Sequence, residues 1–268
     1  MASNASQSSF YVGYLPKMPV SIRRFILPWI LFLLVLVSAF AYLLVQGQKG
    51  FSSGTFELGK LTTLEGDLLT SPVPMLRVYS PQDKASRQAS QEILLIGFGK
   101  NGAQQDIAVW EEQAGHSLER HRVQLSGTLI YYNGKTLLEL TEGKRSLGMI
   151  MEEKTPIEGL KAEGPVSLVG EIIDPKCYFG VMKPGHGKAH RSCASLCVAG
   201  GIPPVFRVEN EGGNIQYYFL LQEGNVGLNQ SVKPFISEAV SIQGTMQSRN
   251  NWNYLYIADL TNIQRLNN

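Results

Sequence analysis

All three cysteines of this chain, and two of its four histidines, lie between Cys177 and Cys197. Thiolates and imidazoles are the ligands that Zn, Cu and Fe commonly take from proteins, and a pair of thiols can also exchange with disulfides. Cysteine is absent from the rest of the sequence, so this concentration is the strongest chemical signal in the chain. We therefore expect any chemistry to take place in this segment.

The sequence around these residues predicts a loop followed by a short helix. Asp174 ends a predicted strand, because the proline that follows it disfavours helical backbone angles. Glycine and proline recur over residues 180–187, which is typical of a loop. Residues 188–199 are predicted to form a helix that stops at Gly200 and Gly201.

On such a helix three potential ligands share one face. Successive residues are rotated by about 100°, which places His190, Cys193 and Cys197 within an arc of about 60°. The preceding loop would bring Cys177 to that face. The candidate metal ligands are therefore Cys177, His190, Cys193 and Cys197, with His186 and Asp174 as second choices.

Three interpretations of this segment remain open. In the first, Cys177 forms a disulfide with Cys193 or Cys197 and only staples the loop to the helix, which stabilises the fold by about 3 kcal/mol. In the second, the thiols and His190 bind Zn, Cu or haem, although the spacing matches neither a zinc finger nor the C-x-x-C-H haem motif. In the third, Cys193 or Cys197 is the reactive thiol of a thiol–disulfide oxidoreductase.

A long uncharged segment near the N-terminus predicts a membrane anchor. Residues 25–45 are apolar and, as a helix, would span about 30 Å, the thickness of the hydrocarbon core of a bilayer. The alternative, a cleaved signal peptide, has a shorter apolar region. Lys17, Arg23 and Arg24 precede the segment, so the positive-inside rule places the N-terminus in the cytoplasm. In a bacterium this describes a single-pass protein of the inner membrane, with its C-terminal part in the periplasm or outside the cell.

The sequence after the anchor repeats itself. Residues 123–128 (VQLSGT) resemble residues 240–245 (VSIQGT), and each stretch is followed by a turn and another apolar run. Residues 64–69 and 168–173 also resemble each other, with a glycine at the third position of each. The first pair of similar segments therefore lies near the end of each stretch and the second pair near its start. Because both pairs occur in the same order, the sequence predicts a duplicated unit of about a hundred residues.

Short runs rich in β-branched and aromatic residues, with glycines at bends, predict a mainly β protein. Five strands per unit favour two tandem small β-barrels of the OB type after a single transmembrane helix, with a β-sandwich as the second choice. The expected order is a cytoplasmic tail (1–22), the anchor (23–46), a first OB-like domain (55–150), a linker (151–156) and a second OB-like domain that carries the Cys/His segment (160–268).

The second unit also resembles a group of small exported bacterial OB-like domains. These domains share the pattern G-x-[IL]-x-D-x-x-C followed by H-x-x-C-A-x-x-C-[VI]-x-x-G. The matching residues here are Gly170, Ile172, Asp174, Cys177, His190, Cys193, Ala194, Cys197, Val198 and Gly201. The resemblance covers about a hundred residues and implies an exported OB-like module, without assigning an activity to it. The chain differs from these domains in an inserted loop at 179–188 and in a first unit without cysteines.

Composition and motifs exclude several functions. The net charge is only +2, and three positive charges precede the anchor, so the remainder lacks the basic surface that nucleic-acid binding needs. Neither G-x-S-x-G nor a phosphate-binding loop is present. We therefore expect a non-enzymatic, membrane-anchored accessory module that binds a metal, haem or a protein partner through residues 174–204, within a membrane redox or assembly complex. The alternatives are the thiol–disulfide oxidoreductase and a purely structural interaction protein.

Overall fold

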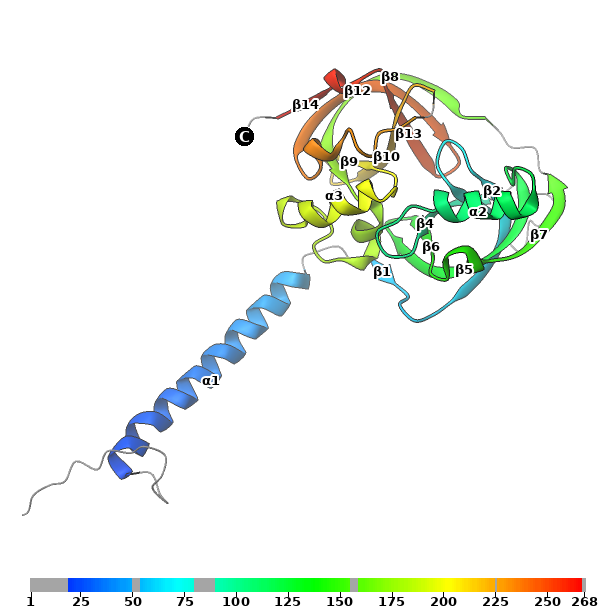
Figure 1. The fold of residues 1–268 in the computed structure, drawn as a ribbon. Coiled ribbons are helices and arrows are strands. Elements are labelled where there is room, and N and C mark those ends of the chain that lie inside the picture. Colours follow the sequence, from blue (N-terminus) through cyan, green and yellow to red (C-terminus); the bar gives the residue numbers. More distant parts are fainter. Residues whose placement is uncertain (1–18, 50–53, 80–89, 155–158, 225, 267–268) are drawn as a thin grey trace, which may run out of the picture. The chain divides into compact units, whose positions relative to one another are not determined.

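The computed structural model describes residues 19–49, 54–79, 90–154, 159–224 and 226–266. The chain divides into two compact units, Met1–Gly50 and Phe51–Asn268. The first unit contains helix α1 (Val20–Lys49), and the second contains every strand that the structure describes (Figure 1).

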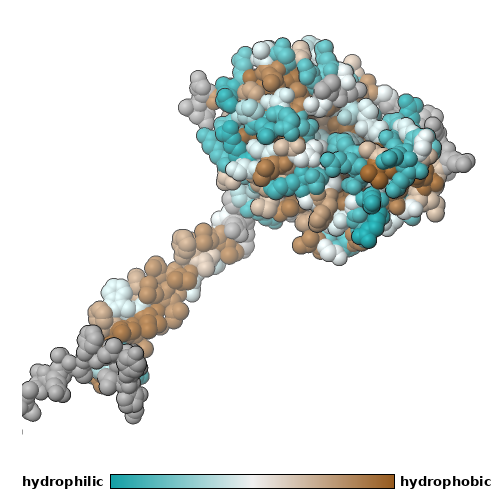
Figure 2. Space-filling view, in the orientation of Figure 1, coloured by the Kyte–Doolittle hydropathy of each residue, from teal (hydrophilic) through white to brown (hydrophobic). Residues whose placement is uncertain are grey.

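Helix α1 has the length and composition of a membrane span. The 28 residues Val20–Gly47 are long and apolar enough to cross a bilayer, and none of the residues in their most apolar window is buried. Figure 2 shows apolar side chains along the visible face of this helix. The helix begins at Val20, ahead of the apolar run, so Pro28 lies inside the helix and not in its first turn.

The first seven-stranded sheet contains a closed five-stranded barrel. Its strands are β1 (Thr55–Phe56), β2 (Thr62–Leu69), β3 (Met75–Tyr79), β4 (Ser90–Gly97), β5 (His121–Tyr132), β6 (Lys135–Leu140) and β7 (Leu147–Lys154). Five of them pair in the circular order β2-β3-β4-β6-β5, and the ring closes where β5 pairs with β2. All pairs in the ring are antiparallel except β4 and β6, which are parallel. Helix α2 (Gln104–Ala114) lies between β4 and β5 in the chain.

The second seven-stranded sheet repeats these pairings. Its strands are β8 (Lys161–Ile173), β9 (Val205–Glu209), β10 (Ile215–Gln222), β11 (Val226–Gly227), β12 (Ala239–Arg249), β13 (Trp252–Ile257) and β14 (Ile263–Arg265). The strands β8, β9, β10, β13 and β12 pair in sequence, and β12 pairs with β8. The parallel pair among these five strands, β10 with β13, corresponds to the parallel pair of β4 and β6 in the first sheet.

The register of the two sheets agrees with the sequence repeat. Gly66 is opposite Val123 in the first sheet, and Gly170 is opposite Val240 in the second. A Cβ atom on Gly66 would lie 2.3 Å from a backbone oxygen of β3, and one on Gly170 would lie 2.2 Å from a backbone oxygen of β9. Because a real Cβ atom does not approach so closely, only glycine allows the neighbouring strand to pass at these two matched positions.

Each sheet has its own hydrophobic core, and a third core lies between the sheets. Along β4, Ile93 and Leu95 pack into the core of the first sheet, whereas Leu94 and Ile96 pack into a cluster that also contains residues of the second sheet, such as Phe219. We call this cluster the shared core. Residues 93–96 of β4 are therefore buried on both faces, which explains why these four residues are all apolar.

Strands β10 and β13 of the second sheet show the same arrangement. Tyr218 and Leu220 pack into the core of the second sheet, while Tyr217 and Phe219 pack into the shared core. Trp252, at the start of β13, is also part of the shared core. The two sheets are thus joined by apolar packing of the kind found inside a domain.

Three details differ from the sequence predictions. The predicted linker at 151–156 overlaps strand β7, which continues to Lys154 because it pairs with β5. The sequence from Trp110 to Gly115 predicts a turn of helix, and the helix found there, α2, begins earlier, at Gln104. The polar stretch 80–92 predicts a loop or a short surface helix. Residues 80–89 lie outside the described residues, and residues 90–92 belong to β4.

Candidate functional site

The Cys/His segment is an insertion between the first two strands of the second sheet. It consists of η2 (Cys177–Val181), η3 (Lys188–His190) and helix α3 (Arg191–Ala199). In the first sheet, the equivalent connection between β2 and β3 is only residues 70–74. The candidate site is therefore an addition that the first half of the repeat lacks.

Short-range hydrogen bonds shape this insertion. The carboxylate of Asp174 accepts the backbone N–H of Lys176 at 2.9 Å, and the backbone oxygen of Asp174 accepts the N–H of Tyr178 at 3.1 Å. These bonds start the turn that carries Cys177. The predicted helix over 188–199 is confirmed, since η3 and α3 together cover it. It ends before Gly201, whose φ of 102° favours glycine.

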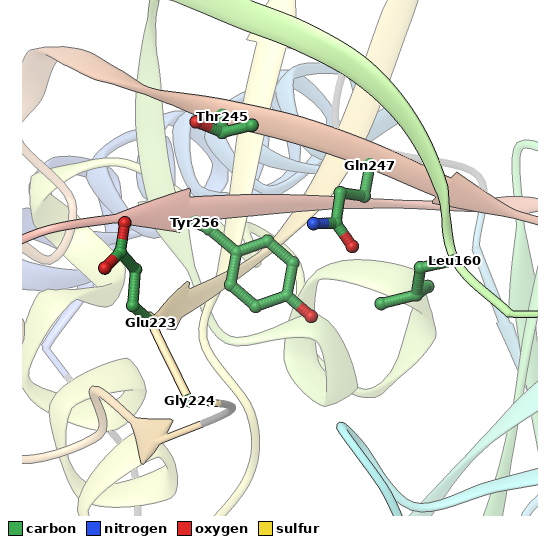
Figure 3. Close-up of a pocket in the computed structure, with 6 residues that line it drawn as sticks. All are labelled: Leu160, Glu223, Gly224, Thr245, Gln247 and Tyr256. Atoms are coloured by element: carbon green, nitrogen blue, oxygen red, sulfur yellow. The ribbon is translucent and has the colours of Figure 1, made fainter.

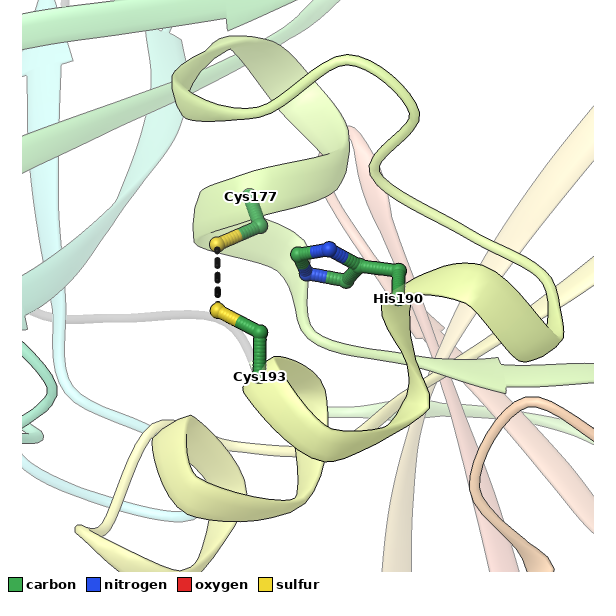
Figure 4. A group of neighbouring side chains, drawn as sticks. All are labelled: Cys177, His190 and Cys193. Atoms are coloured by element: carbon green, nitrogen blue, oxygen red, sulfur yellow. Dashed lines mark hydrogen bonds between the residues drawn. The ribbon is translucent and has the colours of Figure 1, made fainter.

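Two thiols and one imidazole converge in the first group of side chains. The ligand atoms of Cys177, His190 and Cys193 all lie within 4.8 Å of one another, and the two Sγ atoms are 3.9 Å apart. Figure 4 shows the imidazole pointing from the start of the helix towards the two sulfur atoms. Within the described residues, the buried Nε2 atom of His190 has no hydrogen-bond partner, so it is available as a ligand or as a proton acceptor.

A second group shares Cys177 with the first. It consists of Asp174, Cys177 and Cys197, whose ligand atoms also lie within 4.8 Å of one another. All three residues are buried, and the second carboxylate oxygen of Asp174 has no hydrogen-bond partner among the described residues. Cys177 is therefore the centre of the site, with Cys193 and His190 on one side and Cys197 and Asp174 on the other.

The three cysteines differ in their accessibility. Cys177 and Cys197 are 3% and 2% exposed, whereas Cys193 is half-buried. All three lie in the described part of the chain, and none of them is in a disulfide. The disulfide staple predicted as one interpretation is thus not formed in this structure, although the 3.9 Å contact brings two of the sulfurs together.

The surroundings favour uncharged forms of two groups. A hydrogen bond with Cys197, together with burial and the nearby carboxylate of Asp174, raises the pKa of the Cys177 thiol. Burial lowers the pKa of His190. In the metal-free protein, Cys177 therefore keeps its proton and His190 stays neutral near pH 7, the form in which its nitrogen can accept a proton or bind a metal.

A lysine of the first sheet completes the site. The Nζ atom of Lys100 donates a hydrogen bond to Sγ of Cys193 at 3.3 Å. This bond raises the pKa of Lys100, so its ammonium remains charged beside the thiol. Lys100 lies in the Gly-rich loop after β4, and it comes from the opposite half of the repeat.

A backbone hydrogen bond and a buried lysine side chain fix the loop that carries Lys100 to the Cys/His segment. The N–H of Gly102 donates to the backbone oxygen of Gly200 at 3.0 Å. The buried ammonium of Lys176, next to Cys177, donates to the backbone oxygen of Gly99 at 2.6 Å and to the carboxylate of Glu139 at 2.5 Å. The site therefore lies where the two sheets meet, and both sheets contribute to it.

His186 is the one predicted site residue outside both groups. Its side chain is partly exposed, and its Nδ1 atom lies 3.8 Å from the carboxylate of Glu171. Its ring packs against Tyr178, with 5.8 Å between the ring centroids. The other five predicted residues, Asp174, Cys177, His190, Cys193 and Cys197, all belong to the two groups.

A separate hollow of about 400 Å³ lies on the second sheet (Figure 3). Its lining residues are Leu160, Glu223, Gly224, Thr245, Gln247 and Tyr256. These residues include no thiol and no imidazole, so this hollow is not part of the Cys/His site.

Comparison with known proteins returned no match. No protein-family model, no curated protein and no solved structure matches this chain. The function must therefore be argued from the site itself.

Proposed function

We propose that this chain is a membrane-anchored accessory protein that holds one thiophilic metal ion, Zn(II) or Cu(I), through Cys177, His190 and Cys193. The observation that carries the proposal is the convergence of three soft or borderline ligand atoms within 4.8 Å, one of them a buried imidazole nitrogen without a partner. Thiolate and imidazole ligands select these metals over Mg(II) and Ca(II).

The spacing of the sulfur atoms suits a single ion. Two thiolates that each lie about 2.3 Å from one metal are separated by about 3.8–4.0 Å. The Sγ atoms of Cys177 and Cys193 are 3.9 Å apart, so they need little movement to bind. Cys197 and Asp174 share Cys177 as a neighbour and are the candidates for a further ligand.

The packing around Cys177 favours a metal ion over haem. Cys177 and His190 are 3% and 4% exposed. The loop that follows η2 packs directly on the turn, because a Cβ atom on Gly185 would lie only 2.6 Å from Cα of Tyr178. A porphyrin would have to displace this loop, whereas an ion would not.

The proposed architecture is two OB-type barrels side by side. The first barrel has the OB strand order, and the pairings, the register and the matched glycines support a second barrel of the same type. The resemblance of the second unit to exported bacterial domains agrees with this assignment. In an OB barrel the second and third strands usually form the ligand-binding face. In both halves of this protein these strands contribute side chains to the shared core. This packing supports ligand binding at the Cys/His site and not on those faces.

We also propose that the barrels lie outside the cytoplasm. The apolar helix supports an anchor, and the excess of positive charge before it supports a cytoplasmic N-terminus. A reporter enzyme that is active only outside the cytoplasm, fused after Asn268, should be active in intact cells. A second reporter that is active only in the cytoplasm can be fused at the same position. If it is active and the first fusion is not, the C-terminal part faces the cytoplasm and the proposed orientation is wrong.

Metal analysis of the full chain in detergent tests the metal site. The reduced protein, loaded with Zn(II) or Cu(I) and freed of excess ions, should retain one equivalent of metal. The substitutions C177S, C193S and H190Q should each abolish retention, because each removes one of the three ligands. H186Q is the matched control and should retain the metal, since His186 lies outside both groups.

Two outcomes would contradict the proposal. The first is that neither metal is retained by the folded, reduced wild-type chain. The second is that H186Q loses the metal as completely as H190Q does. An intense visible absorption band of the purified protein would instead support haem.

A further inference from the structure

The three thiols of the site are not equivalent, because solvent reaches only one of them. Cys193 is half-buried and is the one of the three that solvent reaches, while Cys177 and Cys197 are buried. The Sγ atom of Cys193 touches that of Cys177 at 3.9 Å. Cys197 belongs to the group around Asp174 and Cys177, and not to the group that contains Cys193.

We propose that Cys193 and Cys177 form a thiol–disulfide exchange pair, in which Cys193 meets a disulfide substrate and Cys177 resolves the mixed disulfide. The sequence predicts Cys193 or Cys197 as the reactive thiol, whereas the geometry selects Cys177 as the partner of Cys193. This inference goes beyond the proposed metal site and does not depend on it.

The first step uses Cys193 and Lys100. The thiolate sulfur of Cys193 attacks one sulfur of a substrate disulfide, R–S–S–R, to form Cys193–S–S–R, and R–S⁻ leaves with the electron pair of the broken bond. The ammonium of Lys100, 3.3 Å from the attacking sulfur, orients and stabilises it as a thiolate. Lys100 acts here as a positioning residue, because it does not itself exchange bonds.

The second step uses Cys177 and His190. The sulfur of Cys177 attacks Cys193–S–S–R at the sulfur of Cys193, and the second R–S⁻ leaves. The thiol proton of Cys177 passes to the free nitrogen of His190 and from there to solvent or to the departing thiolate. In total, the two cysteines are oxidised to a disulfide, the substrate disulfide is reduced to two thiols, and the reverse reaction donates the disulfide to a dithiol.

Disulfide formation and metal binding exclude each other at this site. Both use the sulfur atoms of Cys177 and Cys193, and a disulfide sulfur is a poor ligand compared with a thiolate. If the metal site is present, exchange with a substrate disulfide therefore releases the ion. The metal-free protein carries out the same exchange.

Reaction of the full chain in detergent with oxidised glutathione tests the pair. The reduced, metal-free wild type should lose two hydrogen atoms by intact mass, and peptide mapping should join Cys177 to Cys193. C177S should stop at a glutathione adduct on Cys193, because the resolving thiol is absent. C193S should form neither product, and the control H186Q, which changes a residue outside both groups, should form the same disulfide as the wild type.

Lys100 has its own test in the C177S background. K100M should slow formation of the adduct by about two- to five-fold, the effect of one exposed charge. K100R should restore most of the rate, because it keeps the charge.

Several outcomes would overturn the proposal. They are a wild-type disulfide that includes Cys197, an adduct on Cys197 in place of Cys193, and a stable adduct on the wild type with no resolution. Because the wild-type mapping needs no variant, a substitution that prevents folding does not remove the test. A chain that exchanges disulfides but retains no metal would refute the proposed function alone, and the opposite result would refute this inference alone.

Discussion

The carboxylate of Glu92 on β4 and the guanidinium of Arg249 on β12 form an ion pair between the two sheets, with 2.9 Å between Oε1 and Nε. The same oxygen lies 2.6 Å from a guanidinium nitrogen of Arg77 on β3. Glu92 is fully buried, and the side chains of both arginines are less than a tenth exposed. One carboxylate therefore pairs with two buried cations where the two sheets meet.

Replacement of Glu92 should destabilise the joint between the sheets. E92Q keeps the shape of the side chain but leaves Arg77 and Arg249 without a counter-charge, which should lower the free energy of unfolding by about 3–5 kcal/mol. Urea unfolding of the full chain in detergent, followed by tryptophan fluorescence, measures the change. The control E163Q removes a carboxylate from an exposed pair with Lys161 and should leave the unfolding midpoint unchanged. Equal stability of E92Q and the wild type would show that this ion pair does not hold the sheets together.

The buried pair of Lys176 and Glu139 gives a second prediction. Both side chains are about 5% exposed or less, so K176M should leave an uncompensated carboxylate and cost about 3–5 kcal/mol. The double variant K176M/E139M removes both charges and should recover most of that loss, because well-packed apolar groups can replace a buried ion pair. Thermal unfolding by circular dichroism compares the two. A double variant less stable than K176M would contradict this account.

Stability should also depend on the charge of Lys135. Its ammonium lies 4.6 Å from the ring centroid of Trp252, and burial lowers its pKa from 10.5 to about 8. Between pH 8 and 10.5 the unfolded chain binds this proton and the folded chain does not, so stability should rise with pH across this window.

The difference in the free energy of unfolding between the wild type and K135Q isolates that effect. It should grow in favour of the wild type from pH 8 to 10.5, by at most about 3 kcal/mol, and should be constant below pH 8. The exposed Lys161 provides the control K161Q, which should follow the wild type at every pH. A difference that stays flat across the window would mean that attraction to the Trp252 ring offsets the cost of burial.

Much of the local structure was predictable because it depends on neighbouring residues. The matched glycines, Gly66 with Gly170 and Gly127 with Gly244, mark places where one strand passes close to another. The helix that presents His190 and Cys193 was predictable from the glycines that end it. These features follow from backbone sterics, which a sequence displays directly.

The contact between the two sheets was not predictable in the same way. Lys100 lies 93 residues from Cys193 in the sequence, and Lys176 lies 77 residues from Gly99. A single lysine in a Gly-rich turn has no periodicity to indicate its partner. The shared core is also hidden, because strands buried on both faces lose the alternation that tells an inner face from an outer one.

The contact between Gly200 and the loop of Lys100 gives the last prediction. A Cβ atom on Gly200 would lie 1.9 Å from the backbone oxygen of Lys100, although its φ of −76° suits any residue. G200A should therefore strain no backbone angle of its own but push the loop away from helix α3, at a cost of about 1–3 kcal/mol. Lys100 would then move away from Cys193.

This displacement should slow the reaction of Cys193 without removing either thiol. In the C177S background, G200A should reduce the rate of glutathione adduct formation as K100M does, and G200A combined with K100M should be no slower than either alone. The control G212A lies in a turn where a Cβ atom meets only an ordinary contact of 3.4 Å, and it should react at the parental rate. Additive effects of G200A and K100M would contradict this account, because they would mean that the loop acts on Cys193 by a route other than its lysine.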